Sequence, residues 1–227
     1  MRVNKKNILL FLILLFFILS VGSAFYIYNS PNAILFLLEG CDKPSKQYSV
    51  FSNRLYKISN KKKLGDKLLY QLQQNKNNQV HDLYINILGI IGDEKAFDYL
   101  LNEALEQKAD TPLSSKMYYI VLSMGMIGDK RFSPTLEKML VAPDYNSFGV
   151  SKYDVARALY LITGKRYEYI GQSGKKTKIT LTEELVKARE ITRRPKDYNR
   201  SYNDMLLLAN LDLPSEDGTR VINVRKA

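Results

Sequence analysis

The chain of 227 residues is long enough for one domain with a sizeable core after an N-terminal apolar segment is set aside. Its hydrophobic content of 45% and charged content of 25% are ordinary for a globular protein and argue against disorder of the whole chain. The net charge of +11, from 34 basic and 23 acidic residues, favours anionic partners such as nucleic acid, an acidic protein or a membrane surface. The same charge also fits scattered basic side chains that solvate a helical surface.

Residues 8–28 form an apolar run of about the length that crosses a bilayer. Residues 1–7 ahead of it carry basic but no acidic side chains, which predicts an N-terminus inside the cytoplasm and a C-terminal domain outside it. We therefore predict a single-pass membrane anchor at 8–28, followed by a membrane-proximal linker at 29–44. Within that linker, the apolar stretch Ile34–Leu38 suits a membrane surface.

Two other interpretations of the N-terminus remain open. A cleaved signal peptide fits the basic start, the apolar core and the small residues Gly22–Ala24, and it would leave a secreted or periplasmic protein. The stretch Leu38–Cys41 resembles a bacterial lipobox, although Glu39 departs from the pattern and Cys41 lies well beyond the apolar core. The sequence therefore does not decide whether residues 8–28 are cleaved or whether Cys41 is lipidated.

A sequence repeat with a period of 36 residues follows this segment. The hexapeptide Leu88–Asp93 is echoed by Met124–Asp129, and a glycine recurs one period later at Gly164. Apolar residues at helical spacing precede each glycine, so each unit is predicted as a helix, a tight turn and a second helix. The internal glycines Gly89 and Gly125 lie within the first helices, where we expect close approach of a neighbouring helix.

The repeat turns carry the residues that we single out. Their glycines suit the left-handed conformation that ends a helix, and the aspartates can accept N–H groups of the following turn. These structural repeat-turn residues are Gly92, Asp93, Gly128, Asp129 and Gly164.

The pattern Leu-Gly-x-Ile-Gly-Asp, with Pro and Leu in the second helix, resembles the HEAT-like repeats of the phycobilin-lyase type. Leu88–Asp93 matches it, and Gly125–Asp129 with Pro134 matches it better, whereas Asp98 stands where the family pattern has Pro. The resemblance covers about residues 77–170 and implies an α-solenoid. It implies bilin chemistry only for a few members of that group, and we do not transfer this activity.

We therefore predict an all-α fold, an α-solenoid of HEAT-like helical hairpins at residues 45–212, with the transmembrane or signal helix before it. Repeats are expected around residues 77–108, 113–141 and 150–170, after capping helices at Tyr48–Ser59 and Lys61–Gln74. After the repeats we predict a polar basic loop at Gly171–Lys178 and then a helix from a capping box at Thr180 to about Arg193. A last helix at Asp197–Leu211 and a polar tail at 213–227 follow.

The sequence offers no recognisable catalytic chemistry. A Walker loop, a dinucleotide fingerprint, a G-x-S-x-G elbow and an H-E-x-x-H motif are all missing from it. The single Cys41 excludes an intramolecular disulfide, and the single His81 excludes a His-rich zinc site or a Cys/His zinc finger. We therefore predict that the chain is not an enzyme, with no catalytic, cofactor-binding or metal-binding residues and no cofactor.

The sequence favours a non-catalytic protein, membrane-tethered or exported, that binds another protein at the cell envelope as a scaffold. A candidate partner-binding loop contains Tyr145 and Phe148, in the connection between two repeats. One alternative is an envelope enzyme or accessory subunit with an unrecognised site. The other is a cytosol-facing nucleic-acid binder, which needs the reverse topology and would use basic residues including Arg157, Arg166 and Arg200 to contact phosphates.

Overall fold

The computed structural model describes residues 16–17, 20–22, 30–40, 52–57, 61–74, 78–106, 115–142, 150–171, 174–194 and 200–211. The chain divides into two compact units, residues 1–59 and 60–227, and each is described by itself. Across the described residues, no helix combines the length and the apolar character that a bilayer crossing requires. Most of the predicted anchor at 8–28 lies outside the described residues, as do Cys41 and the tail at 213–227.

The first unit contains a helix where the sequence predicted only a linker. Helix α2 (Pro31–Glu39) begins with a proline in its first turn, where the missing N–H costs no helical hydrogen bond. Its apolar residues continue without a helix breaker as far as Gly40. Phe36 of this helix is 74% exposed.

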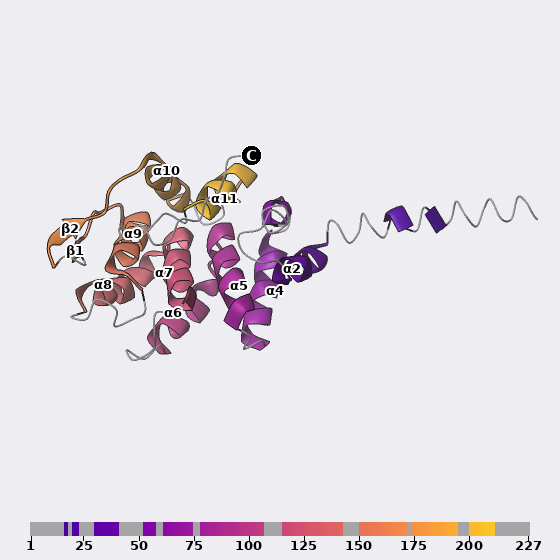
Figure 1. Cartoon of the computed structure of the whole chain (residues 1–227), viewed down its shortest axis with the longest axis horizontal. Helices are drawn as coiled ribbons and strands as arrows, with labels where there is room; N and C mark the ends of the chain where they lie inside the picture. The colour runs from indigo at the N-terminus through magenta and orange to yellow at the C-terminus, as the bar shows by residue number, and fades with distance from the viewer. Residues whose placement is uncertain are drawn as a thin grey trace, which may run out of the picture. The chain divides into compact units, whose positions relative to one another are not determined.

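The second unit is built of helices with one small hairpin (Figure 1). Its helices are α4 (Lys61–Gln74), α5 (Asn78–Ile91), α6 (Ala96–Glu106), α7 (Ser115–Ile127), the short 3-10 helix η1 (Lys130–Phe132), α8 (Ser133–Val141), α9 (Lys152–Thr163), α10 (Glu183–Thr192) and α11 (Tyr202–Ala209). The strands β1 (Glu168–Ile170) and β2 (Lys176–Lys178) pair in antiparallel register. The described chain is thus mainly helical, as the sequence predicted.

The first helices of the three repeats stand side by side in the second unit. Helix α7 packs between α5 and α9, and α4 packs on the other side of α5. Helices α6 and α8, at the lower edge of Figure 1, pack against α7 and α9, respectively. Helices α10 and α11, at the upper edge, contact α7, α9 and α5. The C-terminal part of the chain therefore returns over helices that precede it by many residues.

The internal glycines allow the first helices to approach closely. A Cβ at Gly89 would lie 2.7 Å from the Cα of Ser123, and a Cβ at Gly125 would lie 2.8 Å from the Cα of Ala158. The buried hydroxyl of Ser123 also donates a hydrogen bond of 2.8 Å to the carbonyl of Ile85. The prediction of close helix approach at these two glycines is confirmed, and it explains why glycine is tolerated inside the helices.

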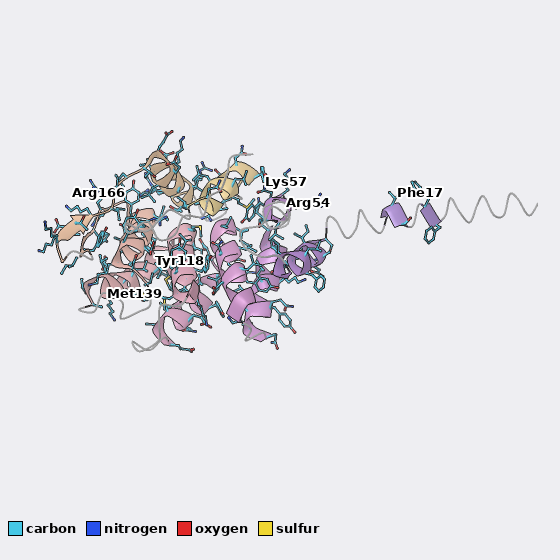
Figure 2. All side chains as sticks on the ribbon, viewed as in Figure 1. Phe17, Arg54, Lys57, Tyr118, Met139 and Arg166 are labelled. Carbon is cyan, nitrogen blue, oxygen red and sulfur yellow. The ribbon has the colours of Figure 1, made fainter. Side chains whose placement is uncertain are left out.

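The core of the second unit runs through the repeat helices. Tyr118 of α7 and Met139 of α8, labelled in Figure 2, are both buried. Pro134 lies in the first turn of α8, as predicted. Fully buried apolar side chains of α5, α7 and α9 include Ile85, Leu88, Ile90, Ile120, Val121, Met124, Ala156 and Leu159.

The third repeat departs from the predicted helical hairpin. Helix α9 is followed by β1 instead of a second helix, and the predicted loop Gly171–Lys178 contains β2. The guanidinium of Arg166, which is labelled in Figure 2, lies at the start of this hairpin. It donates to the carbonyl of Ile179 at 2.8 Å and so joins the two ends of the hairpin. Strands of three residues are too short to show a clear alternation of polar and apolar residues in the sequence.

The helices after the hairpin begin later than predicted. Helix α10 is capped by Thr182, whose hydroxyl accepts the N–H of Leu185 at 3.2 Å, so the capping box predicted at Thr180 was wrong. Helix α11 is capped by Ser201 in a capping box with Asp204, and it is shorter than the predicted helix Asp197–Leu211. Several hydroxyl and acidic residues compete as caps in this region, and only the packed position of each helix selects one.

Candidate functional site

The three repeat glycines end their helices in the same way. Each has a positive φ: 74° at Gly92, 77° at Gly128 and 77° at Gly164. The N–H of each glycine donates to the carbonyl four residues before it, at 3.0, 3.2 and 2.8 Å, respectively. The left-handed conformation predicted from the repeat pattern is therefore present at all three positions.

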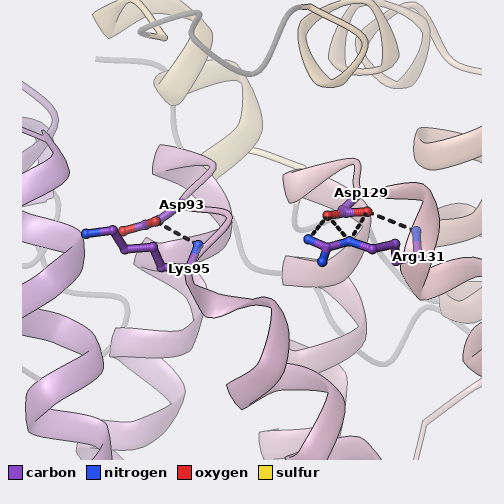
Figure 3. A network of polar contacts seen from close by, with 4 residues as sticks. All are labelled: Asp93, Lys95, Asp129 and Arg131. Carbon is purple, nitrogen blue, oxygen red and sulfur yellow. Dashed lines mark hydrogen bonds and ion pairs between the residues drawn. The ribbon is translucent and has the colours of Figure 1, made fainter.

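The aspartates of the first two turns accept the predicted backbone hydrogen bonds (Figure 3). Asp93 accepts the N–H of Lys95 at 3.0 Å, and Asp129 accepts the N–H of Arg131 at 2.9 Å. Asp129 also pairs through both carboxylate oxygens with the guanidinium of Arg131. The ammonium group of Lys95 instead pairs with Asp66. Burial raises the pKa of Asp93 above its usual range.

The C-terminal segment, which contains α10 and α11, places one residue against each repeat glycine. The order is reversed, so that the first of these residues faces the last glycine. Added Cβ atoms at the three glycines would meet this segment at 2.5 to 2.6 Å; the atom met is a backbone oxygen at Gly128 and the end of an arginine side chain at Gly92 and Gly164. The facing pairs are Gly164 with Arg189, Gly128 with Thr192, and Gly92 with Arg200. All three glycines suit the left-handed backbone conformation, and at Gly128 a side chain would also clash with the backbone of the facing segment.

Arg200 joins the ends of two repeat helices. Its side chain is buried and donates to the carbonyls of Gly89 at 2.7 Å and Ile90 at 2.9 Å in α5, and to Met126 at 2.5 Å in α7. Burial lowers the pKa of Arg200 to about 10. This value is still well above neutral pH, so the guanidinium remains charged there. Arg200 therefore donates to carbonyl groups at two helix ends, including that of Gly89, which also accepts the N–H of Gly92 at 3.1 Å.

Thr192 serves the third repeat helix in a similar way. Its buried hydroxyl donates to the carbonyl of Leu161 in α9 at 2.8 Å. The buried ends of α5, α7 and α9 are thus all bonded to side chains from the C-terminal segment. The packing of this segment on the repeats has a polar as well as an apolar basis.

A cleft of about 680 Å³ lies between the repeat turns and α10. Its apolar lining comes from Ile127, Ile162 and Ile191. Its carboxylates are Glu94 and Asp129. Cationic side chains outnumber them: Lys130, Arg131, Arg189, Arg193, Arg194 and Arg200.

The cations of the cleft differ in what they contact. Arg131 pairs with Asp129, and Arg194 pairs with Asp204 at 2.8 Å. Arg189 is half-buried, and within the described part of the chain its guanidinium has no hydrogen bond or ion pair. Burial lowers the pKa of Arg189, and the positive charge of Arg193 lowers it further. The cleft thus contains a cation in an environment that disfavours its charge.

The structure brings together some of the residues predicted from sequence. Gly92, Gly128 and Asp129 line the cleft, and Gly164 lies against Arg189 at its wall. The predicted partner-binding residues Tyr145 and Phe148 lie outside the described residues. No group of three or more histidine, cysteine or acidic residues in the described ranges is arranged to hold a metal ion.

The arginines considered for nucleic-acid binding do not form one exposed face. Arg157 is 2% exposed and donates to the carbonyl of Leu211 at 2.5 Å. Arg200 and Arg166 also donate to backbone carbonyls of the second unit. Their role in the structure is to join distant segments, which a count of basic residues in the sequence cannot reveal.

Arg189 and Thr192, which face the repeat turns, were not predicted from the sequence. Arg193 and Arg194 belong to a visible basic cluster, but its position over the repeat turns depends on contacts between residues far apart in the chain. The repeat glycines were the only usable signal, since each marked a place where another segment can approach closely.

Comparison with known proteins adds no identification. No protein-family model matches the chain, and no significant match was found among curated proteins or among solved structures. The resemblance to HEAT-like repeats therefore rests on the sequence motif.

Proposed function

We propose that the chain is a non-catalytic helical-repeat protein, an α-solenoid of HEAT-like hairpins, that binds another protein at the cell envelope. The observation that carries this proposal is the regular stack of α5, α7 and α9 with the same turn geometry at Gly92, Gly128 and Gly164. Stacked repeats present an extended surface, and such surfaces commonly serve protein recognition.

The ends of the second repeat helices supply a candidate contact region. Leu105, near the end of α6, is 63% exposed, and Val141, at the end of α8, is 78% exposed. Large exposed apolar side chains favour contacts with a partner when several lie near one another. The candidate loop with Tyr145 and Phe148 follows Val141 directly in the sequence, which favours partner binding at this end of α8.

The compartment in this proposal comes from the sequence. The apolar run at 8–28 and the basic residues before it favour a domain outside the cytoplasm, either anchored or released after signal cleavage. A partner in the periplasm or at the outer face of the membrane follows from that topology. An envelope partner also distinguishes this proposal from the nucleic-acid alternative.

The proposal is tested in intact source cells with the full chain. A photo-reactive phenylalanine analogue replaces Val141 in one variant and Lys187, an exposed residue of α10, in a control variant. We expect a discrete adduct with one envelope protein from position 141 and none from position 187. A C-terminal reporter that is active only outside the cytoplasm should work in the same cells. A reporter that is active in the cytoplasm, or adducts that are identical at both positions, would contradict the proposal.

A further inference from the structure

The cleft between the repeat turns and α10 has a charge imbalance that packing does not explain. Six cationic side chains and two carboxylates line it. They come from different elements: Lys130 and Arg131 belong to η1, whereas Arg189 belongs to α10 and Arg193 and Arg194 follow it. Positive charge therefore borders the cleft from both sides.

Three of these cations have no acceptor among the described residues: Lys130, Arg189 and Arg193. Arg189 and Arg193 are four residues apart, and the N–H of Arg193 donates to the carbonyl of Arg189 at 3.2 Å, so the helical geometry continues between them. Like charges at this spacing repel each other and destabilise a helix. An anion between the two guanidinium groups would remove this repulsion.

Cationic side chains can also donate hydrogen bonds to the last carbonyl groups of a helix. In this unit, other side chains already donate to those carbonyl groups. Arg200 donates to the last carbonyls of α5 and α7, and the hydroxyl of Thr192 donates to a carbonyl of α9. Arg189 lies against the turn at Gly164 but donates to no carbonyl of the described chain. Arg189 therefore lies at the end of a helix but does not form the hydrogen bonds that would cap that helix.

The size and lining of the cleft define the ligand class. A volume of about 680 Å³ is in the range of small-molecule sites. Guanidinium groups bind phosphate and carboxylate oxygens through paired hydrogen bonds. The isoleucines Ile127, Ile162 and Ile191 reduce the local polarity, which strengthens charge interactions in the cleft. Cations on two sides suit a ligand with more than one negative charge.

We propose that this cleft binds a small, multiply charged oxyanion ligand of the diphosphate type, held by Arg189 and Arg193 from one side and by Lys130 from the other. This site goes beyond the proposed protein-binding function and does not depend on it. Arg189 binds the ligand through its half-buried guanidinium. Arg193 and Lys130, which are exposed, neutralise the remaining negative charge of the ligand.

The test is a calorimetric titration of the full chain, in non-ionic detergent, with inorganic pyrophosphate at constant ionic strength. We expect saturable binding with one site, weaker binding of orthophosphate, and a loss of affinity of about tenfold or more in Arg189→Gln and in Arg193→Gln. The matched control Lys176→Gln removes an equal charge from the exposed strand β2 and should bind as the unmodified chain does. Arg189→Lys, which keeps the charge but not the paired donors, should bind with intermediate affinity.

Thermal unfolding of the same variants separates binding from folding. The proposal expects Arg189→Gln to melt within a few degrees of the unmodified chain while losing affinity. A large loss of stability with unchanged pyrophosphate binding would make Arg189 a purely structural residue and overturn the proposal. Equal losses in Lys176→Gln, or binding of an acidic peptide without binding of pyrophosphate, would overturn it in favour of diffuse charge attraction or a peptide site.

Discussion

Arg200 and Arg189 occupy corresponding positions at the first and third repeat turns, yet their surroundings differ. The guanidinium of each lies 2.5 Å from the position that a Cβ of the facing glycine would take, at Gly92 and Gly164, respectively. Arg200 is 6% exposed and donates to carbonyls of two helices. Arg189 is half-buried, borders the cleft and has no acceptor in the described ranges.

The difference shows how one contact geometry can serve either stability or binding. A buried charge is tolerated when hydrogen bonds compensate for its lost hydration, as they do for Arg200. Burial lowers the pKa of both arginines, so both lose hydration, but only Arg200 recovers hydrogen bonds from the chain. Arg189 therefore retains donors that a ligand can use.

The largest expected effect comes from removing the buried guanidinium. Arg200→Met leaves the carbonyls of Gly89, Ile90 and Met126 without their side-chain donor, and we expect it to cost about 3 kcal/mol or more of unfolding free energy. Arg189→Met is the matched control and should change stability by less than about 0.5 kcal/mol, because it breaks no hydrogen bond of the described chain. Urea unfolding followed by circular dichroism measures both. Equal losses in the two variants would show that the two turns do not differ as described.

A smaller effect is expected at the glycine that faces Thr192. Alanine at Gly128 places a Cβ 2.6 Å from the carbonyl oxygen of Thr192 and also strains the backbone at φ 77°. Gly174→Ala is the matched control, since Gly174 has φ 74° and no atom within 4 Å of an added Cβ.

Backbone strain should cost roughly 1 kcal/mol in both variants, and the contact should add about 1–3 kcal/mol at Gly128 alone. Denaturant midpoints of the two variants, compared with the unmodified chain, give the difference directly. If Gly174→Ala destabilises as much as Gly128→Ala, the contact with the C-terminal segment contributes nothing and only the left-handed conformation matters.

The sequence predicted local features well and long-range features poorly. The period of 36 residues was enough to place the turns at Gly92 and Gly128, because a helix end with a left-handed glycine is specified by neighbouring residues. The helix at Lys61–Gln74 was also predicted with the bounds that the structure has. These are consequences of local spacing and capping.

The β hairpin and the return of the C-terminal segment could not be predicted in this way. Strands β1 and β2 have three residues each, which gives no usable period. Arg200 bonds to Gly89 across 111 residues of sequence, and no local pattern specifies such a pair. The cleft is formed by this return, so its cations were visible in the sequence only as separate basic clusters.

The smallest expected effect compares Asp93 and Asp129, the aspartates of the first two turns, through pH. Burial raises the pKa of Asp93, so the stability that this group contributes is fully present below the ordinary aspartate pKa and is lost as pH rises through the raised value. Asp93→Asn removes this ionisation while keeping an oxygen for the N–H of Lys95. Relative to the unmodified chain, the variant should gain roughly 0.5 kcal/mol, after allowance for partial solvent screening, between about pH 4 and pH 7.

Asp129→Asn should instead lose stability at pH 7, because it removes the carboxylate that forms the bidentate pair with Arg131. Urea unfolding at the two pH values measures both variants against the unmodified chain. A gain at pH 7 in both variants would mean that burial outweighs the ion pair at Asp129 as well. A loss in both would mean that the ionised Asp93 is stabilised by its neighbour Lys95 more than it is disfavoured by burial. Only opposite signs are consistent with one repeated backbone turn whose two aspartates differ in their side-chain partners.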